Sequence, residues 1–167
     1  MAEIKLVPRS EVDPSITWDM TLLYPSDEAF YAELDKLKKE MKAFKEKYEN
    51  KLGDLEVLDE AIRQYEAIEL AVYRASHYAE LPMTVDRLNP KVIENATAFE
   101  AVSVSYAENM SFVMTELISL EEDFLNQFVA EKRPDLAYFV EKVIRQKKHT
   151  LSKDAEQVLS NLSSLPS

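Results

Sequence analysis

The chain contains no cysteine and only one glycine, and these two absences exclude several kinds of site. Without cysteine it can form no disulfide, no thiolate zinc site and no cysteine nucleophile. A single glycine, Gly53, cannot build the glycine-rich loop that cradles a phosphate group. No apolar run approaches the length of a membrane span, and the opening "MAEIKLVPRSEVDPS" lacks the apolar core of a signal peptide. We therefore expect a soluble cytoplasmic protein that has no membrane partner.

The chain is strongly acidic, with a formal net charge of -11. Residues 27–51 are balanced, with seven acidic and seven basic residues, whereas residues 52–149 carry eighteen acidic and ten basic ones. Nucleic-acid phosphates need a basic face, so we expect no nucleic-acid partner. The basic cluster of Arg145, Lys147 and Lys148 ends a predicted helix, where cations complement the helix dipole.

Helical periodicity dominates the segments between the prolines, and no alternating strand pattern competes with it. We expect an all-α fold, an antiparallel bundle of about six helices on which residues 1–26 dock as an extended N-terminal arm. Ser26 and the pair Asn89-Pro90 are predicted helix starts, and Gly53 is a predicted helix stop. Ser119 followed by Glu122 predicts a capping box for a fourth helix, while Pro134 and Ser152 predict the starts of a fifth and a sixth.

Each of the three long predicted helices carries an apolar stripe with steps of three and four residues, the spacing of one helix face. The stripes are Phe30, Leu34, Leu37, Met41, Phe44 and Tyr48 in the first helix, Leu58, Ile62, Tyr65, Ile68, Val72, Ala75 and Ala79 in the second, and Phe99, Val102, Tyr106, Met110, Val113 and Leu117 in the third.

The two histidines do not stand in a metal-binding pattern. A zinc peptidase helix needs His-Glu-x-x-His, but neither His77 nor His149 is followed by glutamate. A di-iron bundle needs glutamate three residues before histidine, and neither position has it. We predict that His77 is a hydrogen-bonded, partly buried side chain. We also predict that the chain itself holds no catalytic, cofactor-binding or metal-binding residue.

Four segments, in order, resemble the N-terminal region of the oligoendopeptidase F family, which are zinc metallopeptidases of the thimet-oligopeptidase-like group. The first is "VPRSEVDPSITWDMTLLYPSDEAFYAEL", and the others are "FKEKYENKLGD", "YRASHYAEL" and "HTLSKDAEQVLSNLS". In the first segment the matching residues are Arg9, Glu11, Thr17, Trp18, Asp19, Leu23, Tyr24, Ser26, Asp27 and Glu28, with Met20 in place of a leucine. The resemblance extends over essentially the whole chain.

The resemblance implies that residues 27–167 form the helical N-terminal region of a larger peptidase. In the family the His-Glu-x-x-His helix lies downstream, so we expect the catalytic domain, and the zinc, to lie outside this chain. The segment alone would be inactive and would form part of the wall of a channel for short unfolded peptides. Its expected partners are that catalytic domain and oligopeptide substrates.

A second interpretation is a free-standing, acidic helical module that binds other proteins, indicated by the narrow apolar stripe of the first helix and the acidic surface. Under either interpretation we expect Trp18, Leu23 and Tyr24 to pack against the helices. If the Trp18 ring is buried, Trp18→Ala should cost about 3–5 kcal/mol.

Overall fold

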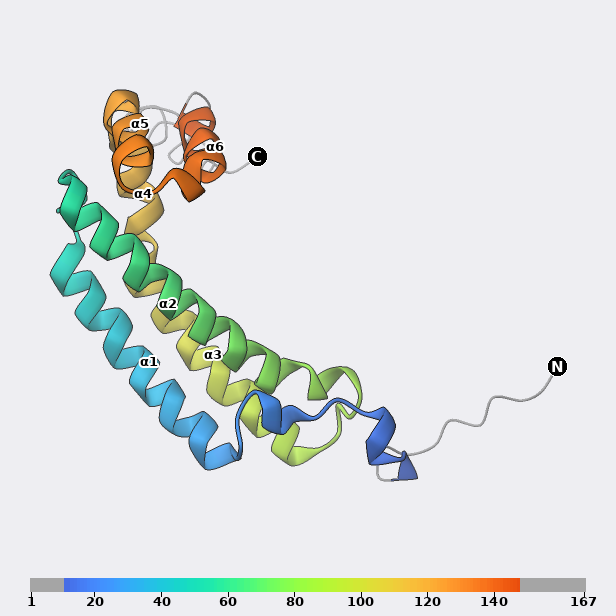
Figure 1. Cartoon of the computed structure of the whole chain (residues 1–167). Helices are drawn as coiled ribbons and strands as arrows, with labels where there is room; N and C mark the ends of the chain where they lie inside the picture. The colour runs from blue at the N-terminus through green and yellow to red at the C-terminus, as the bar shows by residue number, and fades with distance from the viewer. Residues whose placement is uncertain (1–10, 148–167) are drawn as a thin grey trace, which may run out of the picture. The chain divides into compact units, whose positions relative to one another are not determined.

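The structure is a computed structural model that describes residues 11–147, and within this range the chain is helical and contains no strand (Figure 1). The predicted all-α class is therefore confirmed. The helices are α1 (Asp27–Tyr48), α2 (Leu55–Glu80), α3 (Pro90–Met110), α4 (Phe112–Ser119), α5 (Glu122–Glu131) and α6 (Ala137–Lys147). Short 3-10 turns are η2 (Pro14–Ile16), η3 (Met20–Leu22), η4 (Pro82–Thr84) and η5 (Pro134–Leu136).

Two of the predicted helix starts are confirmed by side-chain caps. The Ser26 hydroxyl accepts a hydrogen bond from the Ala29 amide at 3.3 Å, and the Asn89 side chain accepts one from the Lys91 amide at 3.0 Å. Each cap satisfies an amide that has no partner within the first turn of its helix. Pro134 also begins a helical segment, η5 followed directly by α6.

Other predicted boundaries are wrong. The helix expected from Asn89 to Leu117 is divided at Ser111 into α3 and α4. Ser119 does not cap α5, because its hydroxyl donates backward to the Glu116 carbonyl at 2.7 Å. The stop after α1 is provided by Asn50 at φ 63° rather than by Gly53. Asparagine tolerates this left-handed conformation better than most residues. The helix expected from Ser152 lies outside the described residues.

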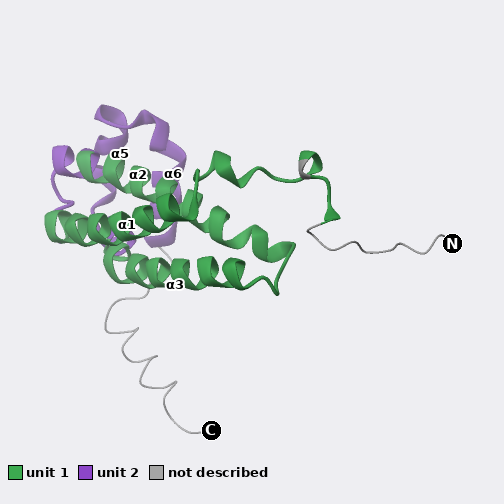
Figure 2. Ribbon diagram, turned by 90° about the horizontal axis from the view of Figure 1, so that it is seen from below, with its two compact units in different colours: residues 1–49, 60–112 green, residues 50–59, 113–167 purple. Residues whose placement is uncertain are grey.

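The chain divides into two compact units, drawn in green and purple in Figure 2. One comprises residues 1–49 and 60–112, and the other comprises residues 50–59 and 113–167. The predicted single bundle thus differs from the structure, in which the helices are shared between two clusters.

In the first unit α1, α2 and α3 lie side by side (Figure 1). Tyr31 meets Asn95 near the start of α1 and α3, and Lys45 meets Glu108 near their ends, so these two helices run parallel. The Tyr78 hydroxyl, near the end of α2, donates to Asp27 at the start of α1, so α2 is antiparallel to α1. Successive helices α1, α2 and α3 thus alternate in direction, as the predicted antiparallel arrangement requires.

The stripe of α1 is the core of this unit, and all six of its side chains are buried as predicted. Burying a side chain of this size stabilises a protein by about 1.5–3 kcal/mol. Aromatic rings fill the space toward α2, with ring centroids 4.8 Å apart for Phe30 and Tyr78 and 6.4 Å apart for Phe44 and Tyr65. Helix α1 therefore supplies the apolar surface that both of its neighbours cover.

The second unit is held by polar contacts around a smaller apolar core. The Glu116 carboxylate of α4 accepts the backbone amides of Asn50 and Leu52 at 2.5 and 3.4 Å. Buried Arg133 forms a two-point ion pair with Asp135, with nitrogen–oxygen distances of 2.9 and 2.7 Å. The core side chains contributed by α5 and α6 are Leu125, Phe128, Val140 and Val143.

The N-terminal arm is anchored at Tyr24 and not at Trp18. Tyr24 is buried, with its ring at an edge-to-face distance of 5.4 Å from the Tyr78 ring, and Arg74 donates a 2.7 Å hydrogen bond to the Leu23 carbonyl. The Trp18 side chain is 81% exposed, so the expectation that its ring packs against the helices is wrong. The Asp19-capped turn η3 lies between Trp18 and the buried Tyr24.

We expect Tyr24→Ala and Trp18→Ala to differ sharply in their effect on the free energy of unfolding. Removing the buried Tyr24 ring should cost about 3–5 kcal/mol because it leaves a cavity. Removing the exposed Trp18 ring should change stability by less than about 0.5 kcal/mol. Urea titration followed by circular dichroism measures both values, and equal losses would contradict the assignment of the anchor.

Candidate functional site

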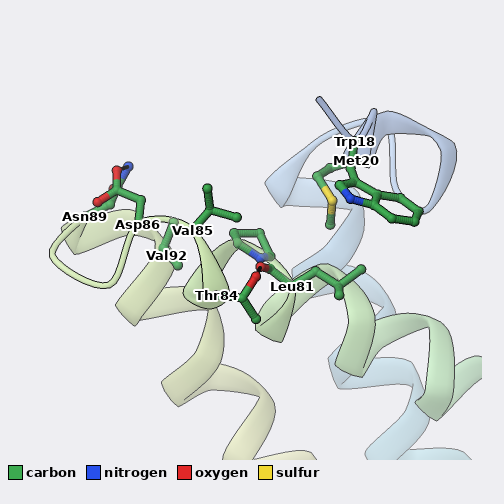
Figure 3. Close-up of a pocket in the computed structure, with 9 residues that line it drawn as sticks. Trp18, Met20, Leu81, Thr84, Val85, Asp86, Asn89 and Val92 are labelled. Atoms are coloured by element: carbon green, nitrogen blue, oxygen red, sulfur yellow. Dashed lines mark hydrogen bonds between the residues drawn. The ribbon is translucent and has the colours of Figure 1, made fainter. Parts of the chain in front are cut away.

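A cleft of about 220 Å³ opens between the N-terminal arm and the turn that joins α2 to α3 (Figure 3). Trp18 and Met20 come from the arm, and the other lining residues come from the connection between α2 and α3, which includes η4, and from the first turn of α3. The lining residues are Trp18, Met20, Leu81, Pro82, Thr84, Val85, Asp86, Asn89 and Val92. Most of these side chains are apolar.

The arm side of the cleft is fixed by a small cap. Asp19 accepts hydrogen bonds from the Thr21 amide at 2.9 Å and from the Thr21 hydroxyl at 2.6 Å. The hydroxyl bond and then the amide bond hold the pKa of the Asp19 carboxyl below its usual value. Asp19 therefore carries its negative charge beside Trp18 and Met20 at neutral pH.

The opposite side is a tightly hydrogen-bonded turn. The amides of Val85 and Asp86 both donate to the Pro82 carbonyl, at 3.1 and 3.0 Å. The Thr84 hydroxyl donates to the Leu81 carbonyl at 2.7 Å. These bonds give η4 a defined shape that does not depend on a ligand.

A polar cluster on the first turn of α1 fixes the end of α2 and the start of α3, the two helix ends that η4 connects. One oxygen of the Asp27 carboxylate accepts hydrogen bonds from the Tyr78 hydroxyl of α2 at 2.9 Å and from the Asn95 amide of α3 at 3.0 Å. Asn95 is itself buried and accepts a 2.7 Å hydrogen bond from the Tyr31 hydroxyl. The Lys91 ammonium group lies 3.6 Å from the second Asp27 oxygen. The end of α2 and the start of α3 are thus joined through one carboxylate.

The contacts in this cluster favour the ionised form of Asp27 and the protonated form of Tyr78. Burial raises the pKa of Asp27, but the hydrogen bonds from Tyr78 and Asn95 and the charge of Lys91 outweigh it, and the net pKa is lowered. Burial, followed by the hydrogen bond to Asp27, raises the pKa of Tyr78 to about 12. At neutral pH Asp27 is ionised and Tyr78 is protonated, which is the state that the hydrogen bond requires.

The polar side chains of the cleft are mostly engaged in local structure. Its polar side chains are Thr84, Asp86 and Asn89, and two of them are engaged in shaping the turn and capping α3. Residues 11–147 contain no group of three or more histidine, aspartate or glutamate side chains that could hold a metal ion. His77, as predicted, is half-buried and hydrogen-bonded, with Nδ1 2.7 Å from the Tyr73 carbonyl oxygen.

No residue of this cleft was predicted as a site from the sequence. The one signal was the placement of Trp18 in a non-periodic arm, and we interpreted it as a packing residue. His149 lies outside the described residues.

The described part of the chain, residues 11–147, has no helix long and apolar enough to cross a membrane.

Comparison with known proteins connects this helical chain to peptidases. The sequence profile of a family described as Oligopeptidase F matches residues 116–165. Oligopeptidase PepF of Bacillus subtilis is 30% identical over 98% of this chain and 25% of its own length. The Oligoendopeptidase F homolog of Borreliella burgdorferi is 23% identical over 96% of this chain and 27% of its own length.

A crystal structure of a protein from Chlamydophila abortus, provisionally assigned as a peptidase, superposes with a TM-score of 0.78 at 25% identity. It covers 95% of this chain and 27% of the other. By fold and similarity, the chain is thus an all-helical relative of peptidases. Its resemblance to the oligoendopeptidase F family is confirmed, and the chain spans about a quarter of the length of the curated relatives it matches.

We expect Asp27→Asn to lower the free energy of unfolding by about 1–2 kcal/mol at neutral pH, because the hydrogen bonds to a charged acceptor become bonds to a neutral one. The folded-state pKa of Asp27 lies below its unfolded value of about 3.9. Its stabilisation is therefore present above that value and is lost as the pH falls through the folded pKa.

The measurement is urea unfolding of both proteins at about pH 7 and about pH 2, where the difference between them should shrink. Asp35→Asn is the matched control, because Asp35 lies on the same helix with its side chain 73% exposed. A control that loses as much stability as Asp27→Asn would contradict the role of the cluster.

Proposed function

We propose that this chain is the N-terminal, non-catalytic helical part of a cytoplasmic zinc oligoendopeptidase that hydrolyses peptide bonds in short unfolded peptides. In this proposal residues 1–26 are its arm and residues 27–167 its helical region. Its three-helix unit forms part of the wall of the substrate channel. Its partners are the catalytic domain, which lies outside this chain, and the oligopeptide substrates.

The observation that carries the proposal is the extent of the matches. Relatives named as oligopeptidases align with 96% and 98% of this chain but with only 27% and 25% of their own length. A chain that is matched from end to end by a quarter of a larger enzyme has the character of one part of that enzyme.

The proposed zinc does not fit the described part of this chain. Residues 11–147 offer no suitable cluster of ligands, so the metal would be held by the remainder of the larger protein. We assign no step of the reaction to residues of this chain, and its proposed contribution is to shape and limit access to the channel.

A free-standing acidic interaction module is the second candidate, and exposed apolar surface fits it as well as it fits the first. Several large apolar side chains of the first unit are exposed, Trp18, Leu22 and Leu88 to 80% or more. Exposed apolar surface of this kind is typical of sites that bind other proteins. The size of the native protein separates the two candidates.

We expect the native protein, captured from its source cells with an antibody against this chain, to be about four times longer than 167 residues, since the chain spans about a quarter of its relatives. It should cleave a short quenched-fluorescence peptide, lose activity to a zinc chelator and regain it when zinc is added. The 167-residue chain, purified alone, should cleave nothing with or without zinc. A native protein that has only 167 residues and is inactive would favour the interaction module.

A further inference from the structure

Exposed apolar side chains gather around Trp18 at one end of the first unit. Trp18 lines two hollows, the cleft described above and a second that it forms with Val12, Ile16 and Thr17, and Val85 borders both. Ile16 is 78% exposed, Trp18 81% and Val85 59%. Single exposed apolar residues are normal on a protein surface, but a contiguous group is not. We call Ile16, Trp18, Met20, Leu81 and Val85, with the two hollows between them, the Trp18 surface.

The segments that form the Trp18 surface are held in place by contacts that involve none of its own side chains. On the arm side, burial of Tyr24 and the bond from Arg74 to the Leu23 carbonyl fix the chain just after η3. On the other side, the Asp27 cluster fixes the ends of α2 and α3 on which η4 is mounted. A surface built in this way is already shaped before anything binds it, which lowers the entropic cost of binding.

Three aspartates occur in the segments that form this apolar area, and one of them, Asp86, lines the cleft. Asp13, Asp19 and Asp86 lie beside or within the segments that form it, and hydrogen bonds from Ser15 and Thr21 hold the pKa of Asp13 and Asp19 below their usual values. An apolar area with aspartates in the segments that form it is complementary to an apolar anchor side chain flanked by lysine or arginine.

We propose that the Trp18 surface is the docking face for the remainder of the larger protein, which places an apolar side chain flanked by basic residues into the cleft. This inference rests on the proposed function, because it takes its occupant from the three quarters of the relatives' length that this chain does not match. The exposure of Trp18 then has a physical reason. Its ring belongs to an interface, and the residues that would cover it lie outside this chain.

The test compares two valines that are equally exposed, at 59% each, of which only one belongs to this surface. Val85 borders both hollows, whereas Val104 lies on α3 and lines neither of them. In the isolated chain, Val85→Asp should leave the thermal midpoint close to that of Val104→Asp. In the native protein, Val85→Asp should lower the thermal midpoint and speed limited proteolysis between this region and the rest of the protein. Val104→Asp should change the midpoint of the native protein no more than it changes that of the isolated chain, and it should not speed proteolysis.

A second measurement follows the ring directly. Hydroxyl-radical oxidation of Trp18, read by mass spectrometry, should be strong in the isolated chain and largely lost in the native protein. Oxidation of Trp18 to the same extent in both proteins would overturn the proposal. So would equal effects of Val85→Asp and Val104→Asp in the native protein.

Three further outcomes are distinguishable. If the native protein forms dimers that Val85→Asp dissociates, the occupant is a second copy and the proposal is wrong. If the native protein is a long, active zinc peptidase in which Trp18 stays exposed, the docking face is wrong while the proposed function stands. If the native protein has only 167 residues, both fail together.

Discussion

One carboxylate determines how the ends of three helices meet. The apolar stripe of α1 provides most of the burial in the first unit, but apolar burial has no direction and would allow the helices to slide against each other. The Asp27 carboxylate accepts from Tyr78 of α2 and from Asn95 of α3, and each bond forms at only one position along those helices. The ring of Tyr24, which anchors the arm, packs edge-to-face against Tyr78, and the η4 turn connects the same helix ends. The Trp18 surface therefore depends on a cluster that it does not touch.

The sequence predicts those features of the structure that are set within a few residues. The stripe from Phe30 to Tyr48 is buried throughout because its spacing is that of one helix face. Caps at Ser26 and Asn89 follow because each side chain bonds an amide two or three residues away. The resemblance to oligoendopeptidase F was likewise recognisable, since the matching residues occur in order along the chain.

Features set by competition or by distant contacts were not predictable in this way. Ser119 had two possible bonds, and the carbonyl of Glu116 replaced the expected cap. Asn50 provides the helix stop that was expected of Gly53, and its amide donates to the Glu116 carboxylate of a helix far along the chain. Trp18 was expected in the core on the general tendency of large apolar rings to be buried. The cleft that it borders is formed by segments more than sixty residues apart in sequence, and periodicity carries no information about such pairs.

The parallel course of α1 and α3 has a consequence for how the chain is made. Their contacts join residues 63 and 64 positions apart, and α2 must cross the whole length of the unit before α3 can arrive. At a synthesis rate of about 5–20 residues per second, α1 leaves the ribosome roughly 3–13 seconds before α3. During that interval α1 has one of its two covering helices at most, and part of its apolar stripe is open to other chains. Because the pairing of α1 with α3 is long-range, the apolar stripe of α1 is partly exposed until α3 has been synthesised. Exposed apolar surface of this kind in a nascent chain is what chaperones bind.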